Sequence, residues 1–129
     1  MAESDNLAAL KGRRVLVVED EPFIAMTLED MLTDLGCVVA GMAGQVGEAL
    51  ALIESTEIDA AVLDVNLGTQ KIDPVADALS ARSLPFVFTT GYGRTGVPAG
   101  HTSHEVVQKP FRMEDLAKAL VDELQRAGR

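Results

Sequence analysis

Short, uninterrupted apolar segments rich in β-branched residues constrain the fold of this chain more than any other feature. They occupy residues 15–18, 60–63 and 86–89. Runs without polar alternation are typical of strands that are buried on both faces. Such strands occur almost only in parallel sheets that are covered by helices on both sides, so the sequence predicts an α/β domain.

Helical patterns fill the intervals between these strands. Apolar residues recur at spacings of three and four in residues 22–35, 46–53, 73–81 and 113–124. Two further apolar segments, residues 37–40 and 105–108, bring the expected number of strands to five. Right-handed crossovers between consecutive strands then give a doubly wound parallel sheet with helices on both faces.

The segment that joins the last two strands breaks this pattern. Residues 91–100 contain four glycines and Pro98, and they show no helical periodicity. We therefore expect the helix between the fourth and fifth strands, the fourth helix in chain order, to be short or degenerate. We also expect residues 93–104 to exchange their amide hydrogens rapidly. His101 and His104 are expected to be solvated side chains of this segment.

Length, charge and cysteine content narrow the class of protein. The 129 residues suit one domain, which we place at residues 12–129 after an N-terminal leader of residues 1–11, with no output domain. The net charge of −9 disfavours nucleic acid and anionic membranes as partners. The lone Cys37 excludes an internal disulfide, and residues 1–10 lack the basic and apolar regions of a signal peptide. A cytoplasmic protein without a membrane span is expected.

Polar residues follow four of the five predicted strands at the point where each strand ends. Glu19 and Asp20 follow the first strand, and Asp64 follows the third. Thr90 ends the fourth strand, and Lys109 ends the fifth. Because ligands of open α/β sheets bind beyond the carboxyl ends of the strands, we expect these five side chains to converge on one site.

These residue types point to phosphoryl transfer onto a carboxylate. Clustered carboxylates repel one another, and a hard divalent cation such as Mg²⁺ relieves that repulsion with one or two of them as ligands. An aspartate can act as a nucleophile and form an aspartyl phosphate. The cation, Lys109 and the Thr90 hydroxyl would then each neutralise or bind one phosphoryl oxygen.

The chain resembles the receiver domains of two-component response regulators. The matching segments, in order along the chain, are Val17-Val18-Glu19-Asp20-Glu21, Leu63-Asp64-Val65-Asn66, Thr90-Gly91 and Lys109-Pro110-Phe111. The resemblance implies a flavodoxin-like fold with strand order 2-1-3-4-5. It also implies a role for each matching residue: Asp64 as phosphoacceptor, Asp20 as direct Mg²⁺ ligand, Glu19 as a ligand through water, the Asn66 backbone carbonyl as a further ligand, Thr90 as switch hydroxyl and Lys109 as the cation that pairs with phosphate.

Three features depart from the usual pattern of the family. No proline follows Asp64 closely, and Val106 stands where an aromatic switch residue is common. The segment Phe88-Thr89-Thr90-Gly91 is similar to the Phe-Ala-Thr-Gly motif of stand-alone receivers that pair with histidine kinases of the HWE class. We therefore expect the signal to pass through the glycine-rich segment, with Tyr92 as the side chain that reports it.

The leading hypothesis is a single-domain response regulator. It would accept a phosphoryl group from a histidine kinase or a histidine phosphotransfer protein and then switch its protein–protein interactions, without being an enzyme in the ordinary sense. One alternative is an aspartyl-phosphate hydrolase of the haloacid dehalogenase type, although Asn66 stands where those enzymes carry a second aspartate. Another alternative is a receiver-like interaction module that is never phosphorylated.

Overall fold

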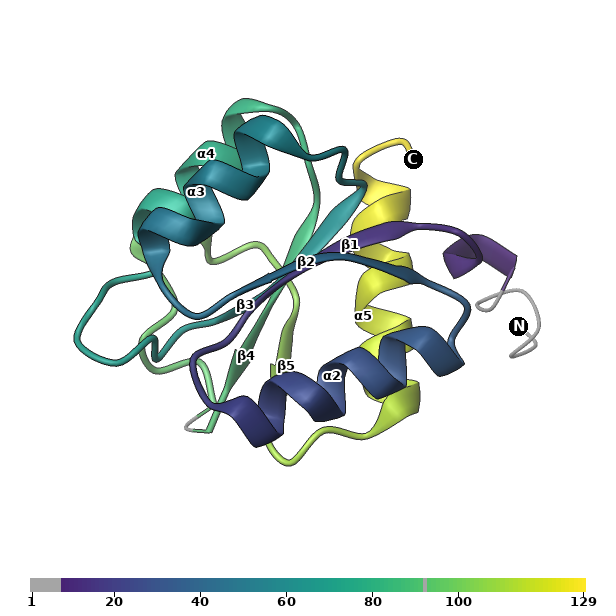
Figure 1. Ribbon diagram of the computed structural model, residues 1–129, viewed down its shortest axis with the longest axis horizontal. Coiled ribbons are helices and arrows are strands. Elements are labelled where there is room, and N and C mark those ends of the chain that lie inside the picture. Colours follow the sequence, from purple (N-terminus) through teal and green to yellow (C-terminus); the bar gives the residue numbers. More distant parts are fainter. Residues whose placement is uncertain (1–7, 92) are drawn as a thin grey trace.

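The computed structural model describes residues 8–91 and 93–129 and contains one parallel sheet (Figure 1). Its strands are β1 (Arg14–Val18), β2 (Val38–Ala43), β3 (Ala60–Asp64), β4 (Phe86–Thr90) and β5 (Val106–Gln108). They lie in the order β2-β1-β3-β4-β5, and every neighbouring pair is parallel. The predicted flavodoxin-like fold and its strand order are confirmed.

Helices cover both faces of the sheet. They are α2 (Pro22–Asp34), α3 (Val46–Ser55), α4 (Asp73–Ala81) and α5 (Met113–Arg126). In Figure 1, α2 and α5 lie on one side of the sheet, and α3 and α4 lie on the other. No helix within the described residues is long and apolar enough to cross a membrane.

Consecutive residues of the central strands feed two separate cores. Val15 and Val17 of β1 pack with α2 and α5, whereas Leu16 and Val18 pack with α3 and α4. Because successive side chains of a strand point to opposite faces, a strand buried on both sides needs an apolar residue at every position. The core on the α2 and α5 side also includes Leu10, a fully buried residue of the predicted leader.

A single turn of 3-10 helix, η1 (Ala99–His101), is the only helix that the structure describes between β4 and β5. The prediction that the helix between the fourth and fifth strands is short or degenerate is therefore confirmed. The prediction that His101 and His104 are solvated is wrong. The His101 side chain is buried and its Nε2 lies 2.7 Å from Asp77 Oδ1 of α4, while the His104 ring stacks on Phe86 with 3.9 Å between ring centroids.

A buried carboxylate on α5 fastens this segment to the domain. Glu123 is 3% exposed, and its two oxygens bind His104 Nδ1 at 2.9 Å, the Glu105 backbone N–H at 2.8 Å and Arg126 at 2.7 Å. Polar anchors thus replace the apolar stripe that would hold a normal helix. Apolar periodicity carries no signal for such polar contacts, so the sequence pattern does not predict that the two histidines are packed.

Candidate functional site

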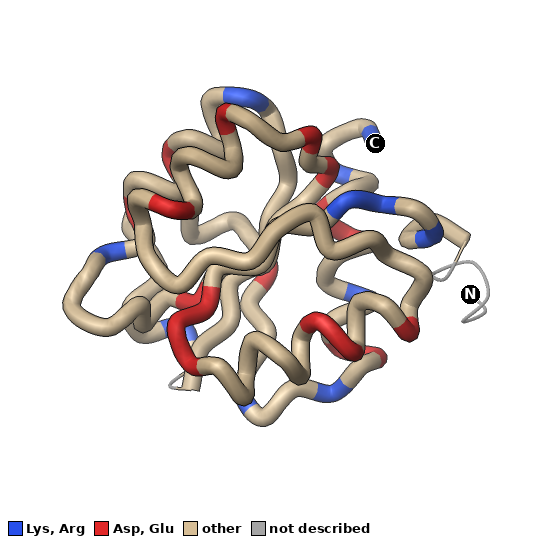
Figure 2. Tube along the Cα trace, in the orientation of Figure 1, with Lys and Arg blue, Asp and Glu red and all other residues tan. Residues whose placement is uncertain are grey.

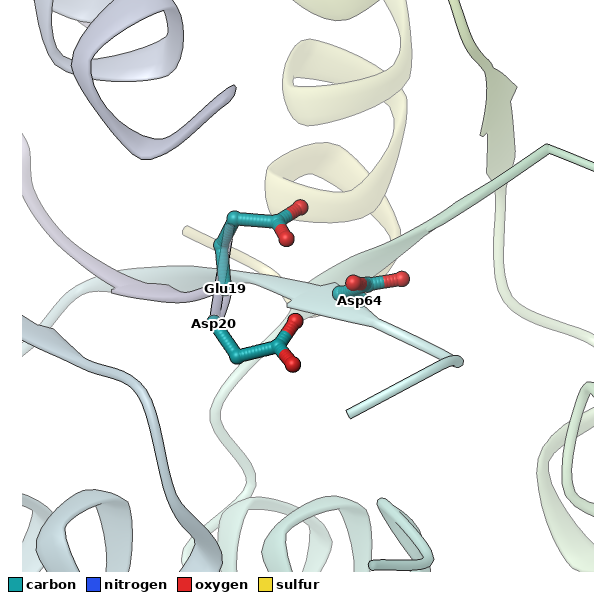
Figure 3. A group of neighbouring side chains, drawn as sticks. All are labelled: Glu19, Asp20 and Asp64. Carbon is teal, nitrogen blue, oxygen red and sulfur yellow. The ribbon is translucent and has the colours of Figure 1, made fainter. Parts of the chain in front are cut away.

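The carboxyl ends of β1 and β3 bring three acidic side chains together (Figure 3). Glu19 and Asp20 follow β1, and Asp64 is the last residue of β3. One carboxylate oxygen from each of the three lies within 4.8 Å of the others. Figure 2 shows the chain directly after β1 as a continuous acidic stretch. Two adjacent parallel strands that end at the same level create this cluster.

Lys109 joins the cluster from the end of β5. Its Nζ lies 3.2 Å from Glu19 Oε1 and 3.3 Å from Asp64 Oδ2. The Lys109 backbone N–H donates a hydrogen bond to the carbonyl of Thr90, which is fully buried at the end of β4. The structure thus brings four of the predicted site residues close together and places Thr90 at the adjoining strand end.

The remaining predicted residues occupy different positions. Asn66 donates its backbone N–H to Asp64 Oδ1 at 3.0 Å, so its peptide lies against the acidic cluster. Val106 is half-buried in β5 opposite Phe88 of β4 and packs on the α3 and α4 side. Tyr92, the predicted reporter, lies outside the described residues.

Burial controls the electrostatics of the cluster. Glu19 is 5% exposed and Asp64 is 2% exposed. Burial raises the pKa of Glu19 to about 7, and the neighbouring Asp64 acts in the same direction, whereas the Glu21 backbone N–H and Lys109 act to lower it. A carboxylate taken out of water disfavours its charged form, and a second negative charge close by adds to this effect.

This site fits a hard divalent cation. All three acidic side chains offer oxygen ligands, and Asp20 is exposed to solvent, which would leave room for the waters that Mg²⁺ retains. Glu19 Oε1 is buried and accepts no well-formed hydrogen bond from the described residues, despite the nearby Lys109 ammonium. Such a buried carboxylate oxygen fits the demand for a cation or its bound water. Asp20, Asp64, Glu19 and the Asn66 carbonyl are the groups that could hold it.

Gly68 and Gln70, which line the site beside Asp20, are not among the residues predicted from the sequence. Gly68 has a positive φ of 61°, and a Cβ atom there would lie 3.5 Å from Asp20 Oδ2. A glycine in a polar turn directly after a strand was a signal that could have identified it. Gln70 accepts a hydrogen bond from the Val46 backbone N–H, 24 residues away, at 2.8 Å. No local pattern indicates a contact over that distance.

The strand order and the acidic cluster at the carboxyl edge of the sheet define an α/β domain of the receiver type, and comparison with known proteins places the chain in a family. Residues 15–121 match the response regulator receiver domain, so the chain belongs to that family of signalling domains. The transcriptional regulatory protein PdtaR of Mycobacterium tuberculosis is 34% identical over 114 residues, covering 84% of this chain and 55% of PdtaR. The chain therefore spans about half the length of that relative.

Two further proteins are matched over almost their whole length. The chemotaxis protein CheY of Thermotoga maritima is 36% identical over 116 residues, covering 84% of this chain and 95% of CheY. The solution structure of SdrG from Sphingomonas melonis is 49% identical with a TM-score of 0.79, and the match covers 91% of this chain and 98% of SdrG. These similarities confirm the predicted membership of the receiver family.

Proposed function

We propose that this receiver domain accepts a phosphoryl group on Asp64 and acts as a protein-interaction switch in a phosphorelay. One observation carries the proposal: the buried Asp64 carboxylate ends the central strand β3 close to two other carboxylates and to the Lys109 ammonium. A buried carboxylate in this setting is suited to accept a phosphoryl group, because the acidic neighbours can bind a divalent cation and the lysine can pair with the new negative charge.

The transfer step follows from the chemistry of the groups. A carboxylate oxygen of Asp64 forms a bond to phosphorus while the phosphorus–nitrogen bond of a phosphohistidine breaks, and the departing imidazole takes up a proton. A bound Mg²⁺ would neutralise charge on the phosphoryl oxygens. Lys109, 3.3 Å from Asp64 Oδ2, is placed to pair with one of these oxygens. Thr90, at the adjoining strand end, is the hydroxyl proposed to bind another.

The phosphodonor is proposed to be a histidine kinase or a histidine phosphotransfer protein. Exposed apolar side chains lie on the two segments that leave the site: Phe23 and Met26 on α2 are 79% and 57% exposed, and Met113 at the start of α5 is 39% exposed. Apolar residues gathered near a polar site suit a protein partner that brings its own reactive histidine. The sequence similarity of Phe88-Thr89-Thr90-Gly91 to the variant receiver motif supports a kinase of the HWE class.

The proposed output is a change in the surface around β4 and β5 in a cytoplasmic protein. Val106 cannot provide an aromatic ring to fill space vacated by Thr90, so the glycine-rich segment after β4 is proposed to respond instead. Gly93 and Gly96 in this segment adopt positive φ values, and η1 supplies only one helical turn, so its described residues can respond without breaking a regular helix.

Intact mass spectrometry tests the proposed function. With Mg²⁺ and acetyl phosphate, the parent chain should gain one acid-labile phosphate and Asp64→Asn should gain none. Asp30→Asn is a matched control, since Asp30 is an exposed residue of α2 away from the cluster, and it should behave as the parent. Equal phosphorylation of Asp64→Asn, or no phosphorylation of the parent, would refute the assignment. Multiple turnover of p-nitrophenyl phosphate would instead identify the hydrolase alternative.

A further inference from the structure

The segment that follows Asp64 forms a tight, fastened turn. Leu67 is 2% exposed within the core on the α3 and α4 side, and the Gln70 backbone N–H donates to the Leu67 carbonyl at 3.0 Å. The same two residues form an isolated antiparallel bridge, and Gly68 between them has the positive φ that the turn requires. Residues 67–70, which we call the site turn, are therefore held at their beginning by apolar burial.

The side chain of Gln70 holds the other end of the site turn. Its Oε1 accepts a hydrogen bond from the Val46 N–H at 2.8 Å. Val46 is the first residue of α3, and the first N–H groups of a helix have no partner within the helix. The N-cap residue Gln45 makes no side-chain capping bond, so Gln70 satisfies this group from a distant part of the chain.

The site turn lies directly against a proposed cation ligand. A Cβ atom at Gly68 would be 3.5 Å from Asp20 Oδ2, and Asp20 and the turn line one hollow of about 470 Å³ with the start of α3. Asn66, whose carbonyl is a proposed ligand, immediately precedes the turn, and its N–H is fixed by Asp64 Oδ1. Any displacement of the turn would thus move the Asn66 carbonyl and the backbone beside Asp20.

We infer that Gln70 is a positioning residue for the cation ligands. No proline stiffens the chain between Asp64 and the site turn, so the bond between Gln70 and Val46 adds a tertiary constraint to the burial of Leu67. This bond also links the proposed phosphorylation site to the first turn of α3. The inference rests on the proposed function, because it assigns Gln70 a role toward the Mg²⁺ that Asp20 and Asp64 are proposed to bind.

The test compares Gln70→Ala with Gln45→Ala in the full chain. Both variants remove the same exposed side chain from residues that line the same hollow, but Gln70 alone of the two supplies the helix-capping bond. Amide exchange is measured by NMR without metal, and Mg²⁺ affinity is measured by titration of the backbone resonances. Gln70→Ala should speed exchange at Val46 and Gln70 and weaken Mg²⁺ binding about 2- to 10-fold, the effect of one hydrogen bond. Gln45→Ala should leave both unchanged.

A third variant tests whether an acceptor oxygen at position 70 is enough to keep the bond to Val46. Gln70→Glu retains an oxygen that can accept from Val46, so exchange at Val46 in metal-free protein should stay close to that of the parent. Unchanged Mg²⁺ affinity in Gln70→Ala, or an equal loss in Gln45→Ala, would overturn the inference. If the parent chain binds no Mg²⁺, the proposed function fails. The titration of the parent alone therefore distinguishes that failure from a failure of the role assigned to Gln70.

Discussion

Removal of the Glu123 carboxylate should destabilise the domain and free the segment before β5. The side chain is 3% exposed and holds three groups: His104, the Glu105 backbone N–H and Arg126. In Glu123→Ala these groups lose their acceptor at a part-buried place. The Glu105 N–H and the His104 ring then have no hydrogen-bond acceptor in place of the carboxylate, whereas the Arg126 side chain, which is 49% exposed, can bind water instead.

The expected magnitude follows from these exposures. A part-buried donor left without an acceptor costs about 1–3 kcal/mol, and loss of the His104 bond adds roughly 1 kcal/mol. Breaking a fully buried ion pair costs about 3–5 kcal/mol, but the exposure of Arg126 places this case at the lower end. We therefore expect a loss of about 3 kcal/mol in the free energy of unfolding, which a domain of this size survives.

Urea denaturation and NMR amide exchange measure this effect. The matched control is Asp122→Ala on the same helix, since the side chain of Asp122 is 34% exposed and pairs with a 75% exposed Lys118, an ion pair that solvent screens and that contributes little. Amides of residues 101–105 should exchange faster in Glu123→Ala and not in the control. A loss of stability no larger than that of Asp122→Ala, or unaltered exchange of residues 101–105, would refute the role assigned to Glu123.

Three more predictions concern single titratable residues. Burial raises the pKa of Glu19 from 4.5 to about 7, so its contribution to stability is full below pH 4.5 and is lost as the pH rises to about 7. In metal-free buffer, the free energy of unfolding of the parent relative to that of Glu19→Gln should therefore fall over this range. A difference that stays constant with pH would contradict this. Burial raises the pKa of the Cys37 thiol to about 11, so iodoacetamide at pH 8 should alkylate it slowly in native protein and rapidly in urea, and equal rates would show the thiol to be accessible. Asp20→Ala should stay folded and bind Mg²⁺ about tenfold or more weakly in an NMR titration; unchanged affinity would place the cation elsewhere.

Much of the fold could be predicted because its signals are local. The apolar runs of β1, β3 and β4 identify strands buried on both faces, and the periodic stripes of α2 and α5 identify the helices that cover one of those faces. The end of each strand then indicates which side chains share one edge of the sheet. This is why the proximity of Asp20, Asp64 and Lys109 was predictable without knowledge of a single distance.

The sequence by itself thus determined the α/β class, the strands and helices and the set of residues that meet at the carboxyl edge of the sheet. Only the tertiary structure decided how the irregular segments are held. The anchoring of His101 by Asp77, of His104 by Glu123 and of the site turn by Val46 depends on polar groups distant in the chain. Hydrophobic periodicity repeats along the chain and can be seen in it, whereas a hydrogen bond between remote residues leaves no local pattern. The raised pKa of Glu19 has the same origin, because burial is a property of the assembled fold and not of the residue.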